Sequence, residues 1–498
     1  MKPSQILLLI LSTFIVLAAV CAVGAGRSSV VRIPSLASFM PEREALVDST
    51  LAESSAVADS MPATRLPDTL AVTTPSTDST ASRKVTELPK ALPQTQLTLP
   101  SFYAALQGAG KQSVRIVHFG DSQIEEDRIS MILRYRLQER FGGGGIGLIP
   151  LVQTIPTCTA KQSVAQDGHV VAASSVKRYL AYGPSAMRLK AGNLYGPMAQ
   201  VAYIDHPVDV SVELLRDRVP TRDYNRIRVL YSDSVEVQLL PDSLEQRRMH
   251  IATRTNDSVA LAEPLLQDIL VLQVPQRSSQ IRFSGNGYVY GLSLETSAGV
   301  QVDNIPMRGA AGTNFTSISR RQLAAYFRET HTALVIMQFG GNAMPAIRSQ
   351  AAVKRYTESM RQQIRYVMAA APKASLLFIG PSDMITVVDG EQMSYPMLPL
   401  LDRALAAMVE EEGGAYYSLF RLMGGAGSMV GWRDKGLAGE DMVHFTRAGA
   451  KKVGEMLAKQ LLEDYDTIVE SQKSIVESQK SIVESQKSIV ESQDTIVQ

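Results

Sequence analysis

The central part of the chain alternates between short apolar runs and segments in which apolar residues recur every three or four positions. The apolar runs occupy residues 113–119, 333–339 and 374–379. After the first run, apolar side chains follow at i, i+3, i+4, i+8 and i+12, the spacing of one helical face: Ile129, Ile132, Leu133, Leu137 and Phe141. Buried strands that alternate with amphipathic helices predict an α/β fold with a doubly wound parallel sheet. Such a sheet places its active site just past the carboxyl ends of its strands.

Residues 156–299 interrupt this pattern. They contain short runs of alternating polar and apolar residues, separated by turn residues roughly every ten positions. Short strands at this spacing predict an antiparallel β-sandwich. Because α/β segments precede and follow it, we interpret this region as a domain inserted between residues 96–155 and 300–465. We expect it to bind polymer, to do no chemistry, and to be removable without large loss of activity on small esters.

The N-terminal segment, residues 1–25, has the features of an export signal, since Lys2 precedes an apolar run from Ile6 to Ala25. About 20 apolar residues are long for a cleaved signal and just enough to span a bilayer. A cleaved signal and a membrane anchor therefore both remain open. Residues 26–95 are rich in Ser, Thr, Pro and Ala and predict a disordered linker.

The C-terminal segment, residues 466–498, repeats Ser-Ile-Val-Glu-Ser-Gln-Lys with a period of seven. Adjacent Ile and Val form one narrow apolar stripe and lack the paired first and fourth positions of a stable coiled coil. Two interpretations remain open: a marginal helix that oligomerises weakly, or a neutral sequence expansion.

Composition excludes several functions. The 50 Lys and Arg balance 49 Asp and Glu, so no basic surface attracts nucleic acid. The two cysteines, Cys21 and Cys158, provide neither a disulfide framework nor a thiolate zinc site. His and carboxylate residues do not cluster at metal-ligand spacing, such as i and i+4 on a helix. We therefore predict no metal and no cofactor.

A serine follows the first apolar run. That run leads through Gly120-Asp121-Ser122-Gln123, and we expect the helix to begin directly after it. A serine at such a turn lies beside backbone N–H groups that can stabilise an oxyanion. Serine is also a common helix cap. Ser122 is therefore either a nucleophile or a cap.

One histidine has a carboxylate at the spacing that a catalytic base requires. A nucleophilic serine needs a base, and the base needs a group that orients it. Of six histidines, only His444 has a carboxylate three positions earlier, Asp441. The alternative is a solvated loop histidine.

Three other polar patterns are interpreted as structural. Asp205-His206 predicts a surface pair. The acidic residues 125–127 predict a helix start that complements the helix dipole. Residues 142–145, four glycines, predict a helix end and a turn.

Three motifs together resemble a known family. His118-Phe-Gly-Asp-Ser122, Gly340-Gly-Asn342 and Asp441-Met-Val-His444-Phe-Thr, in this order, resemble the first, third and fifth blocks of the SGNH/GDSL hydrolases. The resemblance covers about 96–155 and 300–465 and implies a flavodoxin-like three-layer fold. It also implies a triad in which Ser122 is the nucleophile, His444 the base and Asp441 the residue that orients the base.

The resemblance further implies an oxyanion hole. Its donors are the N–H groups of Ser122 and Gly309 and the side chain of Asn342. Gly312 lies on the same loop as Gly309, and Pro306 stands where the second block usually has Gly. Ala343 replaces the Asp that commonly follows the Asn.

An inserted β domain behind an export signal resembles the bacterial peptidoglycan and polysaccharide O-acetylesterase branch. This resemblance implies an exported serine esterase that removes O-acetyl groups from a cell-wall or other polysaccharide through an acyl-enzyme. Its expected location is the periplasm or the cell surface, free or membrane-anchored, and its expected partner is peptidoglycan or another polysaccharide. The alternatives are a lipase or aryl esterase, an O-acetyltransferase, and an inactive glycan-binding surface protein.

Overall fold

The structure is a computed structural model that describes residues 97–183, 195–216, 220–232, 234–240 and 265–496. The predicted export segment 1–25 and linker 26–95 lie outside these ranges. Within them, no helix combines the length and the apolar character that crossing a membrane would need.

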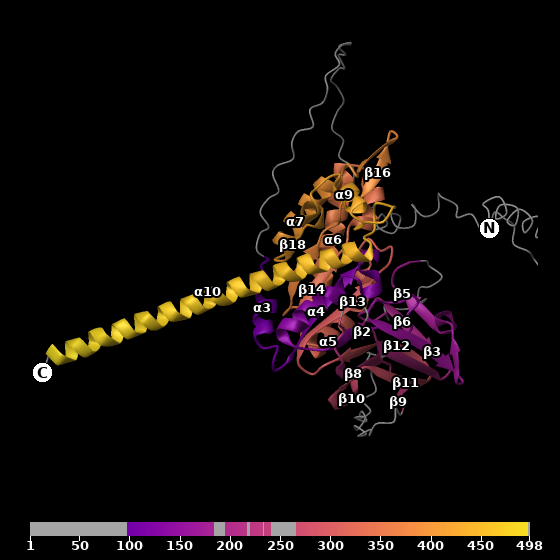
Figure 1. Cartoon of the computed structure of the whole chain (residues 1–498), viewed down its shortest axis with the longest axis horizontal. Coiled ribbons are helices and arrows are strands. Elements are labelled where there is room, and N and C mark those ends of the chain that lie inside the picture. Colours follow the sequence, from indigo (N-terminus) through magenta and orange to yellow (C-terminus); the bar gives the residue numbers. More distant parts are fainter. Residues whose placement is uncertain (1–96, 184–194, 217–219, 233, 241–264, 497–498) are drawn as a thin grey trace, which may run out of the picture. The chain divides into compact units, whose positions relative to one another are not determined.

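A five-stranded sheet forms the centre of the α/β part (Figure 1), and all of its neighbouring strands pair in parallel. Its order is β13-β1-β14-β15-β18. The strands are β1 (Ser113–Gly120), β13 (Gly299–Pro306), β14 (Thr332–Gln338), β15 (Ser375–Ile379) and β18 (Ala415–Tyr417). The apolar runs of the sequence thus become strands, and β1, β14 and β15 are buried along their whole length.

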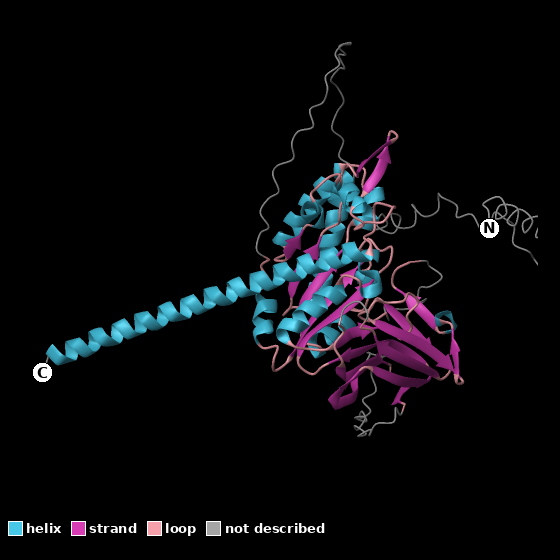
Figure 2. Cartoon of the chain, viewed as in Figure 1, coloured by secondary structure: helices cyan, strands magenta, loops and turns pink. Residues whose placement is uncertain are grey.

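Helices cover both faces of this sheet (Figure 2). On one face lie α3 (Pro100–Gln107), α4 (Ser130–Phe141) and α10 (Arg447–Ile496), and on the other lie α5 (Arg320–Glu329), α6 (Gln350–Ala370) and α7 (Leu398–Glu411). Alternate residues of β1 feed the two cores: Ile116 packs with the first group of helices, and Val117 packs with the second. This arrangement confirms the predicted doubly wound, three-layer fold. After β15 come the hairpin β16 (Ile385–Val388) and β17 (Glu391–Ser394), and the short helices α8 (Leu419–Met423) and α9 (Ser428–Asp434).

The inserted region forms two antiparallel sheets. One has the order β10-β8-β12-β6-β5, with β2 on β12, and the other has the order β4-β3-β7-β11-β9. The strands are β2 (Gly145–Ile149), β3 (Ala160–Gln166), β4 (His169–Val171), β5 (Lys177–Leu180), β6 (Gln200–Ile204), β7 (Val208–Leu214), β8 (Tyr224–Tyr231), β9 (Val235–Leu239), β10 (Leu265–Gln276), β11 (Ser278–Gly285) and β12 (Gly287–Glu295). Apolar side chains from both sheets, such as Val212 and Val229, share one core. The predicted sandwich is confirmed.

The insert is not a separable module. Antiparallel pairing already begins at β2, before residue 156. Leu180, Met198 and Leu230 of the insert belong to the same buried cluster as Phe119 and Phe315 of the α/β part. Removing the insert would expose this cluster to water. Excision of the insert therefore carries a packing cost, and our expectation that it leaves most of the activity on small esters stays a prediction.

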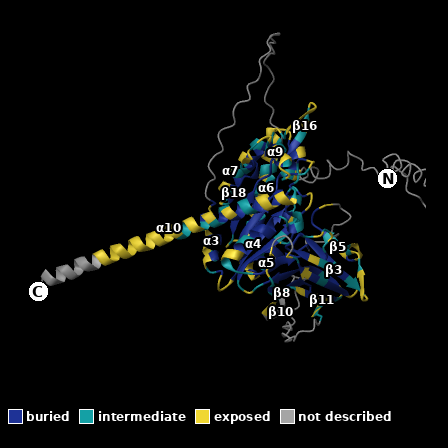
Figure 3. Cartoon of the chain, in the orientation of Figure 1, coloured by how far each residue is buried: buried dark blue, intermediate teal, exposed yellow. Residues whose placement is uncertain are grey.

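The heptad repeat continues the last helix. α10 extends to Ile496, and the side chains of residues 471–485 are exposed (Figure 3). The apolar stripe of Ile475, Val476, Ile482 and Val483 is 49–62% exposed. The repeat is therefore helical and its stripe faces solvent, and both interpretations of the repeat stay open.

Candidate active site

Ser122 lies just past the carboxyl end of β1, as the parallel sheet requires. We expected the α-helix to begin directly after this turn, but it does not. Residues Ser122–Asp127 form the 3-10 helix η3, which is interrupted where Glu126 adopts a positive φ of 62°, and α4 begins only at Ser130. Asp121 caps η3 by accepting a hydrogen bond from the Gln123 N–H at 2.9 Å. The cap is thus the aspartate, which leaves the Ser122 hydroxyl available for other contacts.

A hydrogen-bonded chain joins Ser122 to the loop before α10. The Ser122 Oγ lies 2.9 Å from His444 Nε2, and His444 Nδ1 lies 2.8 Å from Asp441 Oδ2. Asp441 Oδ1 also accepts the backbone N–H groups of Val443 and His444, each at 3.0 Å. Burial acts to raise the pKa of Asp441, but the hydrogen bonds from the His444 ring and backbone outweigh it and lower that pKa. The structure thus brings Ser122 together with a His and Asp pair that lies more than 300 positions away in the sequence.

This chain can activate a hydroxyl group. A neutral imidazole whose Nδ1–H donates to an ionised carboxylate presents a lone pair at Nε2. That lone pair can accept the Ser122 proton as the serine attacks.

Asn342 lies in η7 (Gly341–Ala346), after β14. Its Nδ2 donates to Asp121 Oδ2 and to the Ala310 carbonyl, both at 3.2 Å. Asp121 is buried, and burial raises its pKa to about 6 against these and other hydrogen bonds. Ala343, the residue after Asn342, is buried and has no carboxylate that could accept a hydrogen bond from the amide. Asp121, from another part of the chain, accepts one instead.

Gly309 and Gly312 both have positive φ, yet their surroundings differ. A Cβ on Gly312 would lie 2.6 Å from the Phe339 ring, so Gly312 is needed for packing. A Cβ on Gly309 would meet no atom within 4 Å. The Met307 N–H donates to the Gly120 carbonyl at 2.7 Å, which ties this loop to the end of β1. Of the two glycines, Gly309 is therefore the one that packing does not require.

His118, which opens the first motif, has a structural role. It is fully buried, burial lowers its pKa to about 4, and it contacts Ser130 Oγ at 2.9 Å. Ser130 in turn donates to Asn304, and Asn304 donates to the Ile124 carbonyl. This network connects buried residues of β1, α4 and β13 to the backbone of η3 at Ile124.

The acidic residues 125–127 do not form a helix start, contrary to our expectation. Each faces an arginine: Glu125 lies 3.7 Å from Arg308, Glu126 lies 3.1 Å from Arg447, and Asp127 lies 2.7 Å from Arg134. Because η3 is kinked at this point, its carboxylates point to neighbouring segments.

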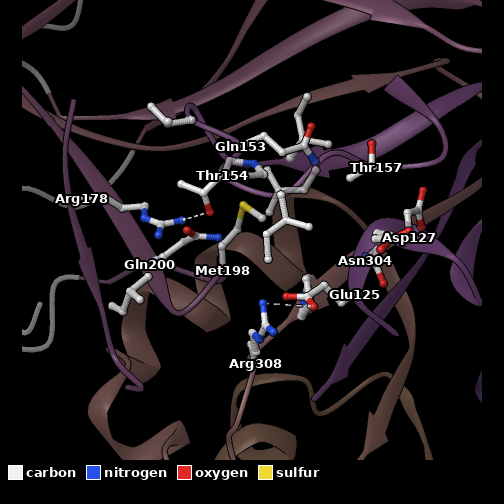
Figure 4. Close-up of a pocket in the computed structure, with 18 of the residues that line it drawn as sticks. Glu125, Asp127, Gln153, Thr154, Thr157, Arg178, Met198, Gln200, Asn304 and Arg308 are labelled. Carbon is white, nitrogen blue, oxygen red and sulfur yellow. Dashed lines mark hydrogen bonds and ion pairs between the residues drawn. The ribbon is translucent and has the colours of Figure 1, made fainter. Parts of the chain in front are cut away.

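A cavity of about 270 Å³ lies beside η3 (Figure 4). Glu125 and Arg308 line it from the α/β part. Arg178 and Gln200 line it from the insert, and Arg178 donates to Oγ1 of Thr154, which precedes the insert, at 3.1 Å. Both parts of the chain therefore build its walls.

Two of the patterns interpreted as structural are confirmed. His206 contacts Asp205 at 2.8 Å and is 75% exposed, and Gly142 ends α4 with φ of 76°. Over the described ranges, no group of three or more His, Cys, Asp or Glu residues is placed to hold a metal ion.

Sequence reasoning missed three residues around Ser122: Asp121, Gln123 and Arg128. The Arg128 guanidinium donates to the Ser122 carbonyl at 2.6 Å. One signal was available for Gln123, since it occupies the position of the Leu in the GDSL motif. For Arg128 the sequence carries no signal.

Comparison with protein-family models and with curated protein sequences finds no match. Among solved structures, the chain is similar to a peptidoglycan O-acetylesterase, with 18% identity and a TM-score of 0.56 over 74% of this chain and 96% of that chain. An acetyl xylan esterase, AlAXEase, has 10% identity and a TM-score of 0.25 over 33% of this chain and 80% of its own. Axe2, an acetylxylan esterase from Geobacillus stearothermophilus, has 15% identity and a TM-score of 0.23 over 34% and 73%.

The first of these likenesses bears on the whole fold. The α/β part alone makes up less than half of the chain, so a match over 74% also takes in the insert. The chain therefore shares the fold of that solved structure, with an α/β part and an inserted β domain.

Proposed function

We propose that this protein is an exported serine esterase that hydrolyses O-acyl esters, above all O-acetyl esters, on a polysaccharide. The observation that carries the proposal is the hydrogen-bonded chain from Ser122 through His444 to Asp441 at the carboxyl end of β1. A surface serine has no need of a base that is itself held by a carboxylate.

In the proposed reaction, Ser122 Oγ attacks the ester carbonyl while His444 Nε2 takes its proton. Asp441 stays ionised and holds the imidazolium. The tetrahedral oxyanion accepts hydrogen bonds from the N–H groups of Ser122 and Gly309 and from the Asn342 amide. Because both Asn342 hydrogens are engaged in the resting structure, one of them must exchange its acceptor for the oxyanion. His444 then protonates the leaving hydroxyl, and water repeats the steps on the acyl-enzyme.

The cavity beside η3 supports a sugar polymer as the substrate. Glu125 of η3, the segment that begins with Ser122, lines it, whereas the triad residues themselves do not. The lining combines polar side chains with apolar ones such as Leu148 and Met198. The insert forms part of its wall, so we propose that the insert binds carbohydrate in this cavity, beside the segment that carries Ser122. A solved structure with this fold is a peptidoglycan O-acetylesterase, which supports a cell-wall substrate and a location in the periplasm or at the cell surface.

The test is acetate release by wild type and two variants, Ser122→Ala and His444→Ala, first from p-nitrophenyl acetate and then from an O-acetylated glycan. Both variants should lose nearly all turnover while circular dichroism stays unchanged. His206→Ala is the matched control, because its ring contacts Asp205 at the same 2.8 Å but lies at the surface of the insert. Retention of more than about a tenth of the wild-type rate by either triad variant would refute the proposal. Repeating the assay with an added sugar acceptor separates hydrolysis from acetyl transfer.

A further inference from the structure

The contact that orients the proposed base lies at the surface. The side chains of His444 and Asp441 are 44% and 53% exposed. Ion pairs between exposed groups compete with water and contribute little to holding a geometry. The position of His444 relative to Ser122 therefore needs a further restraint.

Gln123 contacts the backbone on both sides of His444. Its Nε2 donates to the Val443 carbonyl at 2.8 Å, and its Oε1 accepts the Phe445 N–H at 3.3 Å. Gln123 is only 9% exposed, so these two bonds are less accessible to water than the exposed contact between His444 and Asp441. Its own backbone N–H is held by Asp121. The segment that carries the nucleophile is thus joined by two hydrogen bonds to the loop that carries the base.

Arg128 strengthens the same connection. Its guanidinium donates to the carbonyls of Ser122, Gln123 and Phe445 at 2.6, 3.0 and 3.1 Å. The first two of these carbonyls belong to the nucleophile segment and the third to the base loop. Arg128 thereby fixes the backbone from which the Gln123 side chain extends.

We propose that Gln123 is a positioning residue for the base: its carboxamide fixes the backbone around His444 and so sets the separation of the imidazole and the Ser122 hydroxyl. This inference rests on the proposed function. Asp441 then mainly selects the tautomer of the ring, while Gln123 sets where the ring lies.

The first test is Gln123→Met, which keeps the length of the side chain and removes both hydrogen-bonding atoms. We expect kcat on p-nitrophenyl acetate to fall about 10- to 100-fold, because misplacing a catalytic group by about 1 Å costs up to 10² in rate. KM should change less than about twofold, since ground-state binding is untouched. Rates are referred to active sites counted by end-point titration with a phosphonate ester.

Gln138→Met is the matched control. Gln138 is 2% exposed, and its carboxamide donates to the carbonyls of Gly145 and Val300, but it lies on α4 and does not contact the base loop. A merely structural role of Gln123 would lower the stability of both variants and leave kcat per active site unchanged in both.

A second measurement does not depend on turnover. Carbon-13 relaxation of the His444 Cε1–H bond reports the order of the ring, and we expect its order parameter to fall below about 0.6, the flexible range, only in Gln123→Met. A kcat above one third of the wild-type value, or a ring order unchanged from wild type, would overturn the positioning role. Absence of Ser122-dependent turnover in the wild type would refute the esterase instead, and the relaxation data would still decide the role of Gln123.

Discussion

Arg115 on β1 connects the α/β sheet to the insert, and replacing it tests whether the two parts form one cooperative unit. The guanidinium is fully buried and contacts Asp303 at 2.6 Å and the Glu295 carboxylate. Asp303 lies on β13 of the parallel sheet, whereas Glu295 ends β12 of the insert. Arg115→Met fills most of the same volume but leaves two buried carboxylates without their shared cation.

The expected loss follows from what remains around these carboxylates. Removing one partner of a buried ion pair costs about 3–5 kcal/mol. Asp303 keeps hydrogen bonds from the Leu148 N–H and the Tyr326 hydroxyl, and Glu295 keeps Arg226 and Arg228 at 3.8 Å. Because each carboxylate keeps other partners, we expect the loss of stability to lie at the lower end of this range, about 3 kcal/mol.

The assay is urea unfolding at pH 7, followed by far-ultraviolet circular dichroism and by tryptophan fluorescence. Trp432, the single tryptophan of the chain, lies in α9 and therefore reports the α/β part alone. If the insert and the α/β part unfold together, the two signals give coincident transitions in both wild type and variant.

Arg282→Met provides the comparison, because Arg282 also pairs with a carboxylate, Asp209, at 2.7 Å but is 45% exposed. We expect it to lose less than about 1 kcal/mol. A loss below about 1 kcal/mol for Arg115→Met as well, or fluorescence and dichroism transitions that separate, would refute the reasoning.

Three further outcomes are expected. Asn342→Ala should lower kcat on p-nitrophenyl acetate by about 10²–10³ with KM little changed, and a change in KM alone would make Asn342 a substrate-binding residue. Burial raises the folded-state pKa of Asp121 to about 6, so its protonated form favours folding. The contribution of this group to the free energy of unfolding is fully present below about pH 4 and is lost as the pH rises through about 6. Relative to Asp121→Asn, wild type should therefore lose on the order of 2–3 kcal/mol between pH 4 and 7 in urea unfolding, and parallel pH curves would contradict this. Ending the chain after Lys473 removes residues 474–485, whose side chains are all exposed, together with the residues that follow them. The free energy of unfolding should therefore change by less than about 0.5 kcal/mol; a larger loss would show that the repeat contacts the folded part.

The sequence allowed the α/β fold and the candidate triad to be predicted for different physical reasons. The strands were visible because a sheet covered on both faces needs continuous apolar runs, as in residues 333–339. Asp441 and His444 were visible because a carboxylate three positions before a histidine can reach its ring within one turn. Both signals are local.

What escaped prediction depends on contacts between distant segments. The short apolar stretch at Gly145–Ile149 was assigned to the α/β part, but its partner is β12, and no local pattern distinguishes the two sheets. The positive φ of Glu126 is uncommon outside glycine and is imposed by packing around η3. Gln123 acts on a loop 322 residues away, so its role became visible only in three dimensions.

The placement of β13 has a consequence for how the chain folds. β1 pairs with β13 over its full length, yet the contact between Arg115 and Asp303 spans 188 residues of sequence, and most of the intervening chain is the insert. The entropic cost of closing such a long loop must be met before β13 can pair with β1. A folded insert shortens that loop by bringing its two ends together. We therefore expect the β-sandwich to form before β13 pairs with β1, and the end of β1 that carries Ser122 to be completed only after that pairing.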